Sequence, residues 1–353
     1  MATVVIFGAG VMGTATAFPL TDNGHTVRLV GTHLDDDIIQ SVQDTGFHPT
    51  LRRRLPNAVS AYTTGSLADA LKGADFLLSG VNSYGVRWSA RTLAGALSQP
   101  IPIIAITKGL DSDENGDILS LTTVYERELV AAGGPPCEVS GIGGPCIAGE
   151  LAGRRQSCVV FGSSSSERAR WFADHFRTDY YHIWPTADLF GLEIAAALKN
   201  AYTLPVGIAS GLLDAAGGID ETGAAMHNLA SAIFGQGTSE IRYVLEALGR
   251  NTSLAAHLPG AGDYYVTCAG GRNMTFGRHV GAGKSFSEAR SLMPGQTLES
   301  LSIVSAMATA LPKLYERGVL EQRRMPLMEY LIRTVSAERA GPIPYDDFFP
   351  DLQ

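Results

Sequence analysis

The chain has 353 residues and a mass of 37.4 kDa, which leaves room for two domains of ordinary size. Hydrophobic residues make up 45% and charged residues 18%, a composition typical of folded globular proteins rather than disordered ones. The formal net charge of −8 excludes a general binder of nucleic acid or of anionic membrane surfaces. Only five of the 27 basic residues are lysines, so few side chains offer a titratable amine.

The sequence shows no sign of export or membrane insertion. The apolar run Val4–Phe7 is followed at once by Gly8, so we expect no secretory signal, and no apolar run reaches membrane-spanning length. The four cysteines form no CxxC pair, which indicates reduced thiols and neither a disulfide framework nor a zinc site. We therefore expect a cytoplasmic protein without a bound metal.

The first half of the chain alternates strand and helix patterns. Apolar, β-branched runs predict strands at Thr3–Phe7, Thr26–Val30, Phe76–Ser79, Ile101–Ile106, Val139–Ile142, Ser157–Phe161 and Tyr180–Trp184. Between them, helices are expected at Val11–Asn23, Leu67–Leu71, Arg87–Leu97, Ile118–Ala131, Ile147–Ala152 and Ser166–Phe176. Repeated βαβ units predict an α/β, Rossmann-type domain over residues 1–187, with a doubly wound, mostly parallel sheet.

Strand patterns nearly vanish after Pro185. The second half predicts helices at Leu189–Ala209, Gly223–Leu248, Leu298–Arg317 and Met325–Ser336, followed by an irregular arm from Gly341 onward. Residues 188–353 are therefore expected to form an all-α C-terminal domain.

A glycine-rich loop joins the first strand to the first helix. Gly8, Gly10 and Gly13 form GxGxxG in the strand–helix context that dinucleotide binding requires. Gly8 permits the tight turn, Gly10 lets the backbone approach a pyrophosphate, and Gly13 lets helix and strand pack closely. The amides of Val11 and Met12 would face the phosphates. The alternative is an ordinary strand–helix turn.

The end of the second strand leaves the choice of cofactor open. It reads Gly31-Thr32-His33, with neither the acidic residue that binds a bare ribose nor an arginine for a 2′-phosphate. Three aspartates follow at 35–37, which either repel a phosphate or simply begin a helix. NAD and NADP both remain candidates.

Two lysines stand out as candidates for chemistry. Lys108 directly follows a predicted strand, and strand carboxyl ends face the ligand crevice of such a sheet. Lys199 lies within a run of Ala and Leu, where a charged group is costly unless it is paired or functional. A desolvated lysine suits general acid/base catalysis. The alternatives are a surface amine for Lys108 and a snorkelling side chain for Lys199.

A second group of polar residues follows in the helical half. Asp263 and Thr267 are four residues apart, so one helical turn would place both on one face. Arg272 and Asn273 follow two glycines, and their donors suit a phosphate or a carboxylate. A simple capped turn is the alternative.

Taken together, these motifs resemble NAD(P)-dependent glycerol-3-phosphate dehydrogenases along nearly the whole chain. The matching pieces occur in family order: the glycine loop with Thr14-Ala15, the segments 107–110, 144–151 and 198–200, and Gly262-Asp263 with Thr267, Arg272 and Asn273. The resemblance implies a homodimer that uses NAD or NADP and interconverts sn-glycerol 3-phosphate and dihydroxyacetone phosphate, a step in glycerophospholipid and carbohydrate metabolism.

The resemblance also assigns roles to residues. Lys199 would be the general acid/base, Asp263 would orient it, and Lys108 would polarise or position the substrate. The remaining substrate contacts would be Asn200, Thr267, Arg272 and Asn273. Besides the glycine loop, the cofactor contacts would be Lys108, Gly144, Cys146, Ala148, Arg272 and Glu299.

Several positions depart from the family pattern. Ser300 stands where glycine is usual, Gly235-Gln236-Gly237 where many members have Thr-Arg-Gly, and Tyr264-Tyr265 where aliphatic residues are commoner. These differences keep open a sibling dehydrogenase for another polyol phosphate or a hydroxy acid. A non-catalytic redox sensor is a further alternative, but it would need only the glycine loop and not the two lysines with Asp263.

Overall fold

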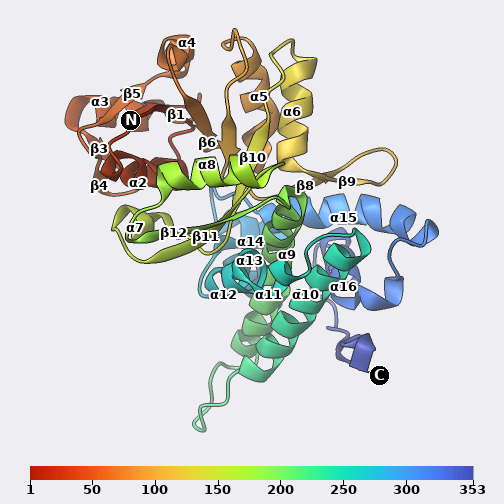
Figure 1. Cartoon of the computed structure of the whole chain (residues 1–353). Coiled ribbons are helices and arrows are strands. Elements are labelled where there is room, and N and C mark those ends of the chain that lie inside the picture. The colour runs from red at the N-terminus through yellow and green to blue at the C-terminus, as the bar shows by residue number, and fades with distance from the viewer. Residues whose placement is uncertain (353) are drawn as a thin grey trace. The chain divides into compact units, whose positions relative to one another are not determined.

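The computed structural model describes residues 1–352 (Figure 1). The chain divides into two compact units. Unit 1 comprises Met1–Lys108 and Leu121–Leu192; unit 2 comprises Gly109–Ser120 and the chain from Glu193 onward. Unit 1 carries the sheet and unit 2 is largely helical, in agreement with the predicted fold class.

Unit 1 is built on one eight-stranded sheet. Its order is β12-β11-β10-β7-β6-β1-β2-β5, and every neighbouring pair is parallel except β10 with β11. The strands are β1 (Thr3–Phe7), β2 (Thr26–Val30), β5 (Val59–Tyr62), β6 (Phe76–Ser79), β7 (Ile103–Ala105), β10 (Val139–Gly143), β11 (Ser157–Gly162) and β12 (Tyr181–Thr186). The inner strands are largely buried, as strands covered on both faces require, whereas the edge strands β5 and β12 are partly exposed.

Helices connect these strands and cover the sheet (Figure 1). They are α1 (Val11–Ala15), α2 (Ala17–Asp22), α3 (Asp36–Thr45), α4 (Leu67–Leu71), α5 (Val86–Ala94), α6 (Leu121–Ala131), α7 (Ala148–Ala152) and α8 (Ser166–Phe176). A short ribbon, β3 (Phe47–His48) with β4 (Arg53–Arg54), follows α3. Two 3₁₀ turns, Thr64–Ser66 and Ser83–Gly85, precede α4 and α5.

Several sequence-based expectations were wrong in detail. The helix expected over Leu189–Ala209 continues to Ala215, and the one expected over Gly223–Leu248 begins only at His227. The helix expected over Val11–Asn23 is interrupted at Thr16, whose hydroxyl donates to the carbonyl of Gly13 at 2.6 Å. The helix expected over Ile118–Ala131 begins only at Leu121. Its first three residues form β9 (Ile118–Ser120), which pairs with β8 (Leu110–Ser112). This hairpin belongs to unit 2, where it packs on helix α15 (Glu299–Glu316).

Unit 2 is helical apart from that hairpin. Its longest helix, α9 (Leu189–Ala215), begins in unit 1. Residues 191–209 of this helix are all buried, which explains why apolar residues occur on every side of it. The others are α10 (His227–Ala247), α11 (Ser253–Ala256), α12 (Asp263–Cys268), α13 (Arg272–Gly281), α14 (Phe286–Ser291), α15 and α16 (Pro326–Ser336), with η3 (Leu258–Gly262) and 3₁₀ turns at Gln322–Arg324, Tyr345–Asp347 and Pro350–Leu352. Within residues 1–352, every helix is too short or too polar to cross a bilayer.

Helices α9 and α13 cross with their backbones almost in contact. A Cβ built on Gly207 or Gly211 of α9 would lie 2.1 Å from a carbonyl oxygen of α13. A Cβ on Gly277 or Gly281 of α13 would lie 2.2 or 2.1 Å from a carbonyl oxygen of α9. Two GxxxG patterns therefore form one glycine crossing, made of these four residues. Four of the chain's 40 glycines thus serve this close approach.

A buried carboxylate joins α10 to the start of α16. Glu240 is fully buried, and its oxygens accept hydrogen bonds from the hydroxyl of Tyr202 at 2.7 Å, the amide of Gln236 at 2.9 Å, and the backbone amides of Leu327 and Met328 at 2.7 and 3.0 Å. It thus satisfies orphan donors at the α16 N-terminus. Burial raises the pKa of Glu240 to about 7, against the lowering effect of these donors.

This raised pKa predicts a specific pH dependence of stability. The folded state favours protonated Glu240, so its contribution is complete below the usual glutamate pKa near 4.5 and is lost as pH rises through about 7. The loss amounts to roughly 3 kcal/mol. Urea unfolding from pH 4.5 to 8 should show wild type losing stability relative to Glu240→Gln. The exposed Glu246→Gln on the same helix is the control, and a parallel pH course for wild type and Glu240→Gln would contradict the prediction.

Candidate active site

The glycine loop lies at the carboxyl end of β1, where it packs against the loop that follows β6. Gly8 has a φ of +111°, and a Cβ on it would lie 2.9 Å from the carbonyl carbon of Gly80. A Cβ on Gly13 would lie 2.9 Å from the oxygen of Gly8. Only hydrogen fits at both positions, as the motif predicts.

The same loop leaves its outer surface open for a ligand. The nearest atom to a Cβ built on Gly10 is 3.8 Å away, so backbone and not side chain faces the space in front of the loop. Gly10 is the N-cap of α1, and no side chain caps its first amides, which include those of Val11 and Met12. This backbone cradle fits the pyrophosphate of a dinucleotide.

Lys108 lies at the same edge of the sheet. The strand register aligns the ends of β1, β6 and β7, so the residues that follow them share one edge. Lys108 Nζ donates to the carbonyl oxygen of Gly144, beyond β10, at 3.1 Å. Its neighbour Thr107 donates to the carbonyl of Val81 at 2.6 Å. These bonds fix the Lys108 segment beside the loops expected to hold the cofactor.

The segment after Gly144 completes this part of unit 1. Gly144 has a φ of +121°, and Cys146 and Ala148 pack against the hydrophobic core of the sheet. Burial, assisted by the adjoining Cys146 thiol, raises the pKa of Tyr181 well above its usual range. The glycine loop, Lys108 and these three residues therefore gather at the strand ends of one unit.

Unit 2 contains a buried cluster of Lys199, Asp263 and Thr267. Lys199 is only 4% exposed, and its Nζ donates to Asp263 Oδ1 at 2.9 Å and to Thr267 Oγ1 at 2.6 Å. The Thr267 hydroxyl in turn donates to the carbonyl of Asp263 at 2.7 Å, as their four-residue spacing predicts. The carboxylate compensates the buried ammonium, and the two acceptors fix the position of Nζ.

The backbone before Asp263 is unusual. Residues 258–262 form a π-type turn in which the amide of Gly262 donates to the carbonyl of His257 at 3.1 Å. A Cβ on Gly260 would lie 2.2 Å from the oxygen of Ala255, so only glycine fits. π-Turns often occur at functional sites, and this one aims Asp263 at Lys199. Burial raises the pKa of nearby Cys268 to about 12, despite the Lys199 ammonium, so this residue remains a thiol.

Arg272 and Glu299 form a second pair in unit 2. Arg272 Nε donates to Glu299 Oε2 at 2.9 Å, and Nη2 donates to the other carboxylate oxygen. The side chain of Glu299 is 8% exposed, whereas that of Arg272 is 48% exposed. No hydrogen bond is made by Arg272 Nη1 to any residue in 1–352. The guanidinium is thus held by a buried carboxylate and still presents donors to solvent.

Asn273 and Asn200 are both buried, and the side chain of Asn273 accepts a hydrogen bond. Its side-chain oxygen accepts from the amide of Ser300 at 3.2 Å, which links α13 to the first turn of α15. Gly271, immediately before α13, donates to the carbonyl of Thr267 at 2.9 Å. The Arg272–Asn273 segment therefore begins one turn beyond the lysine cluster.

Two family models match successive parts of the chain. A family model described as the N-terminus of NAD-dependent glycerol-3-phosphate dehydrogenase matches residues 3–169, and one described as its C-terminus matches residues 188–341. The chain belongs to the NAD-dependent glycerol-3-phosphate dehydrogenase family. The resemblance in its motifs is thereby confirmed.

Named members of the glycerol-3-phosphate dehydrogenase family align over most of the chain. The NADP(+)-dependent glycerol-3-phosphate dehydrogenase of Archaeoglobus fulgidus is 34% identical over 291 residues, which cover 81% of this chain and 82% of that protein. The glycerol-3-phosphate dehydrogenase [NAD(P)+] of Geobacillus kaustophilus is 30% identical over 336 residues, or 94% and 89% of the two chains. The crystal structure of the Coxiella burnetii enzyme shares the fold, with a TM-score of 0.78, 23% identity, and coverage of 100% and 99%.

Sequence reasoning missed two residues that hold the glycine loop of this family member. The backbone amide of Ala9 donates to Asp35 Oδ2 at 3.1 Å, and its carbonyl accepts from His48 Nε2 at 2.8 Å. These contacts join residues 26 and 39 positions apart, so no local pattern could reveal them.

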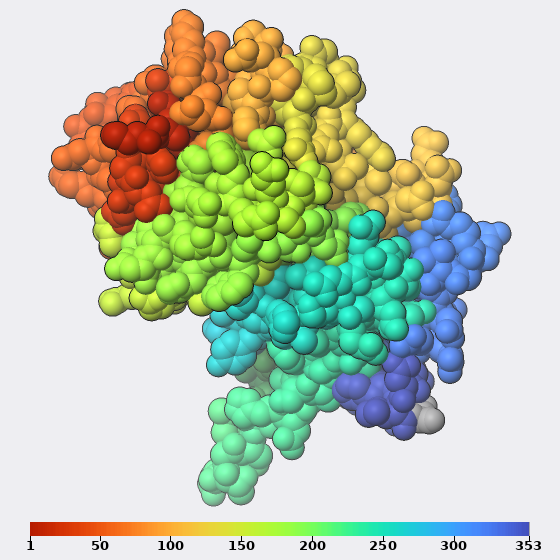
Figure 2. All heavy atoms as spheres, viewed as in Figure 1, coloured from red at the N-terminus to blue at the C-terminus, as the bar shows by residue number. Residues whose placement is uncertain are grey.

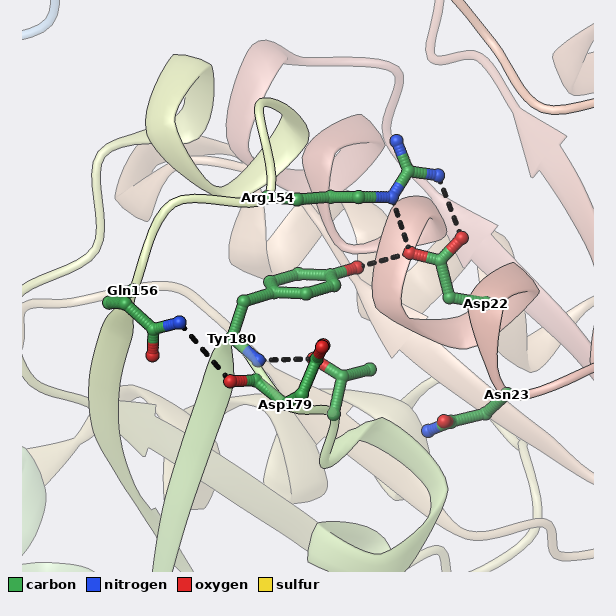
Figure 3. Close-up of a pocket in the computed structure, with 7 residues that line it drawn as sticks. Asp22, Asn23, Arg154, Gln156, Asp179 and Tyr180 are labelled. Carbon is green, nitrogen blue, oxygen red and sulfur yellow. Dashed lines mark hydrogen bonds and ion pairs between the residues drawn. The ribbon is translucent and has the colours of Figure 1, made fainter.

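Unit 1 also has a polar pocket of about 420 Å³, shown in Figure 3. Arg154 makes a bidentate pair with Asp22 at 2.7 and 2.8 Å, which lowers the pKa of that carboxyl, and Tyr180 donates to it at 2.5 Å. The lining is completed by Asn23, Gln156, Thr178 and Asp179. Because these charges neutralise each other, we assign the pocket a structural role.

Proposed function

We propose that the protein reduces dihydroxyacetone phosphate to sn-glycerol 3-phosphate and catalyses the reverse oxidation. The observation that carries this proposal is the buried Lys199–Asp263–Thr267 cluster in unit 2. Family membership and relatives named for this activity support it. Gly8, Gly10, Gly13 and the adjoining amides would hold a nicotinamide dinucleotide, which would supply or accept the hydride.

Lys199 would move the proton of the reaction. In reduction, Nζ donates a proton to the carbonyl oxygen of the substrate; in oxidation, it removes the proton from the hydroxyl group. Asp263 and Thr267 hold Nζ through two acceptor oxygens, so the ammonium is oriented before the substrate arrives. Lys108 would add positive charge beside the substrate carbonyl, and Asn200 would donate to its oxygens.

Arg272 would bind the substrate phosphate. Its exposed guanidinium is oriented by Glu299, whose near-complete burial fixes the pair in one geometry. A planar fork of donors suits phosphate oxygens. Glu299 would act near the cofactor only through this arginine, and Asn273 would add one amide donor.

A homodimer and a cytoplasmic location complete the proposal. Both are implied by the family resemblance. We expect the connection between α9 and α10, which projects from the rest of unit 2 (Figure 2), to be available to a second copy of the chain.

The proposal is tested by NADH and NADPH oxidation against a panel of keto-phosphates and unphosphorylated dihydroxyacetone. We expect dihydroxyacetone phosphate to be the best substrate. Arg272→Ala should lower kcat/KM for it by about 10- to 150-fold, because a charge-assisted bond contributes about 1.5–3 kcal/mol, and should leave kcat/KM for dihydroxyacetone nearly unchanged.

Arg278→Ala is a matched control on the same helix. Arg278 makes a similar bidentate pair with Asp214, at 2.6 and 2.9 Å. This variant should keep normal kinetics if phosphate binding is particular to Arg272. Better turnover of a four- or five-carbon keto-phosphate would instead identify a sibling dehydrogenase, and equal losses for both dihydroxyacetone substrates would refute the phosphate role.

A further inference from the structure

Asp35 lies beside both the glycine loop and the end of β2. It is the N-cap residue of α3, but its side chain does not cap that helix. Instead, Oδ2 accepts from the amide of Ala9 at 3.1 Å, and from the amide and hydroxyl of Thr32, both at 2.8 Å. The carboxylate therefore connects the glycine loop to the end of β2, although it lies five residues beyond that strand.

Close packing brings α3 to this position. A Cβ on Gly31 would lie 2.5 Å from Ile39 Cγ1 and 3.2 Å from Asp35 Cβ, so only glycine lets the helix approach the strand. Gly31 thus stands where an acidic residue is usual, and its lack of a side chain leaves room for Asp35.

Buried His48 holds the loop from the other side. Its Nδ1 accepts from the amide of Leu51 at 3.0 Å, so Nε2 carries the proton and donates to the carbonyl of Ala9 at 2.8 Å. Both backbone groups of Ala9 are therefore engaged, which fixes the loop relative to the Asp35 carboxylate. Such preorganisation lets a ligand bind without first ordering the loop.

We propose that Asp35 makes this protein selective for NAD(H) over NADP(H), an inference that rests on the proposed function. In a Rossmann-type domain, the adenosine ribose lies beside the glycine loop and the end of β2. A carboxylate there accepts a hydrogen bond from the 2′-hydroxyl and repels a 2′-phosphate. The Archaeoglobus fulgidus relative is named NADP(+)-dependent, so the proposal gives this chain the other cofactor preference.

The charged neighbours of Asp35 do not share its contacts. Asp36 and Asp37 follow it in the first turn of α3 but are exposed, so solvent screens their charges more than that of half-buried Asp35. The guanidinium of Arg54 donates to the carbonyl of Thr45, and that of Arg28 donates to the carbonyls of residues 70 and 72. Within residues 1–352, neither arginine forms an ion pair with Asp35.

Direct binding tests the proposal independently of catalysis. Calorimetry on the full chain should compare NADH with NADPH, and adenosine 5′-monophosphate with adenosine 2′,5′-bisphosphate. Wild type should bind the ligand without the 2′-phosphate at least about tenfold more tightly, since like-charge repulsion of about 1.4 kcal/mol has that effect. Asp35→Asn keeps an acceptor oxygen for Ala9 and should bring both ratios close to one. Asp36→Asn removes one negative charge at the next residue and should leave both binding ratios nearly unchanged.

Equal binding of the two members of each pair by wild type would overturn the proposal, whether or not the variants fold. Equal shifts in Asp35→Asn and Asp36→Asn would also overturn it, because they would indicate general charge and not this contact. Reduction of dihydroxyacetone phosphate with NADPH as efficiently as with NADH would refute the selectivity but uphold the proposed function. Selective binding of NADH without turnover of dihydroxyacetone phosphate would uphold the selectivity but refute the proposed function.

Discussion

Replacing Lys199 with methionine is expected to lower kcat for the reduction of dihydroxyacetone phosphate by about 10²- to 10⁴-fold, the usual contribution of a general acid/base. The buried ammonium is held by Asp263 and Thr267, and methionine can neither donate nor accept the proton. Dinucleotide binding should survive, because the glycine loop belongs to unit 1. Stopped-flow NADH oxidation measures the first effect, and calorimetric titration with NADH measures the second.

Lys199→Arg separates proton transfer from simple positive charge. Arginine remains protonated at every accessible pH, so it keeps the charge beside Asp263 but cannot exchange a proton. We expect it to be nearly as inactive as the methionine variant. Lys284→Met is the matched control, since Lys284 is an exposed lysine of the same unit. A near-normal kcat in Lys199→Arg would reduce the role of Lys199 to electrostatics.

Strands and helices with strong local patterns could be predicted from the sequence. Thr3–Phe7, Thr26–Val30, Leu67–Leu71 and Ser166–Phe176 have the expected bounds, because β-branched runs or amphipathic spacing define them locally. The hairpin over 110–120 was missed because its strands are three residues each and are stabilised by packing on α15. The aspartates at 35–37 indicated a helix start only as one of two alternatives, and the bounds of α3 were not predicted because only Ile39 and Val42 of this helix are buried.

In the candidate site, contacts within one helix could be predicted from the sequence, whereas contacts between elements far apart in the chain could not. The Asp263–Thr267 contact follows from helical spacing, whereas Lys199 and Asp263 are 64 residues apart and were associated only through the family resemblance. Asp35 and His48 carry no motif, and their role depends on how α3 and the β3–β4 ribbon fold back on the glycine loop. Spacing identifies residues on one element, but contacts between elements require the structure.

Gly277→Ala should destabilise the protein by at least about 3 kcal/mol, at or above the upper end of ordinary overpacking. The added methyl would lie 2.2 Å from the oxygen of Leu204, a rigid helix backbone atom that cannot rotate away. Urea unfolding measures the loss. Gly341→Ala is the control, because a Cβ there meets no atom within 4 Å. Wild-type stability in Gly277→Ala would show that the helices separate without cost.

The double variant Gly207→Ala/Gly277→Ala tests whether the crossing acts as one unit. A Cβ on Gly277 lies 3.1 Å from the Cα of Gly207, so either methyl forces the same separation of α9 and α13. The double variant should therefore lose less stability than the two single losses combined, since close neighbours are not additive. The crossing also connects the helix that carries Lys199 with the one that carries Arg272. Both single variants should consequently lower kcat/KM for dihydroxyacetone phosphate at temperatures where they remain folded, and unchanged kinetics would show that the crossing contributes to stability alone.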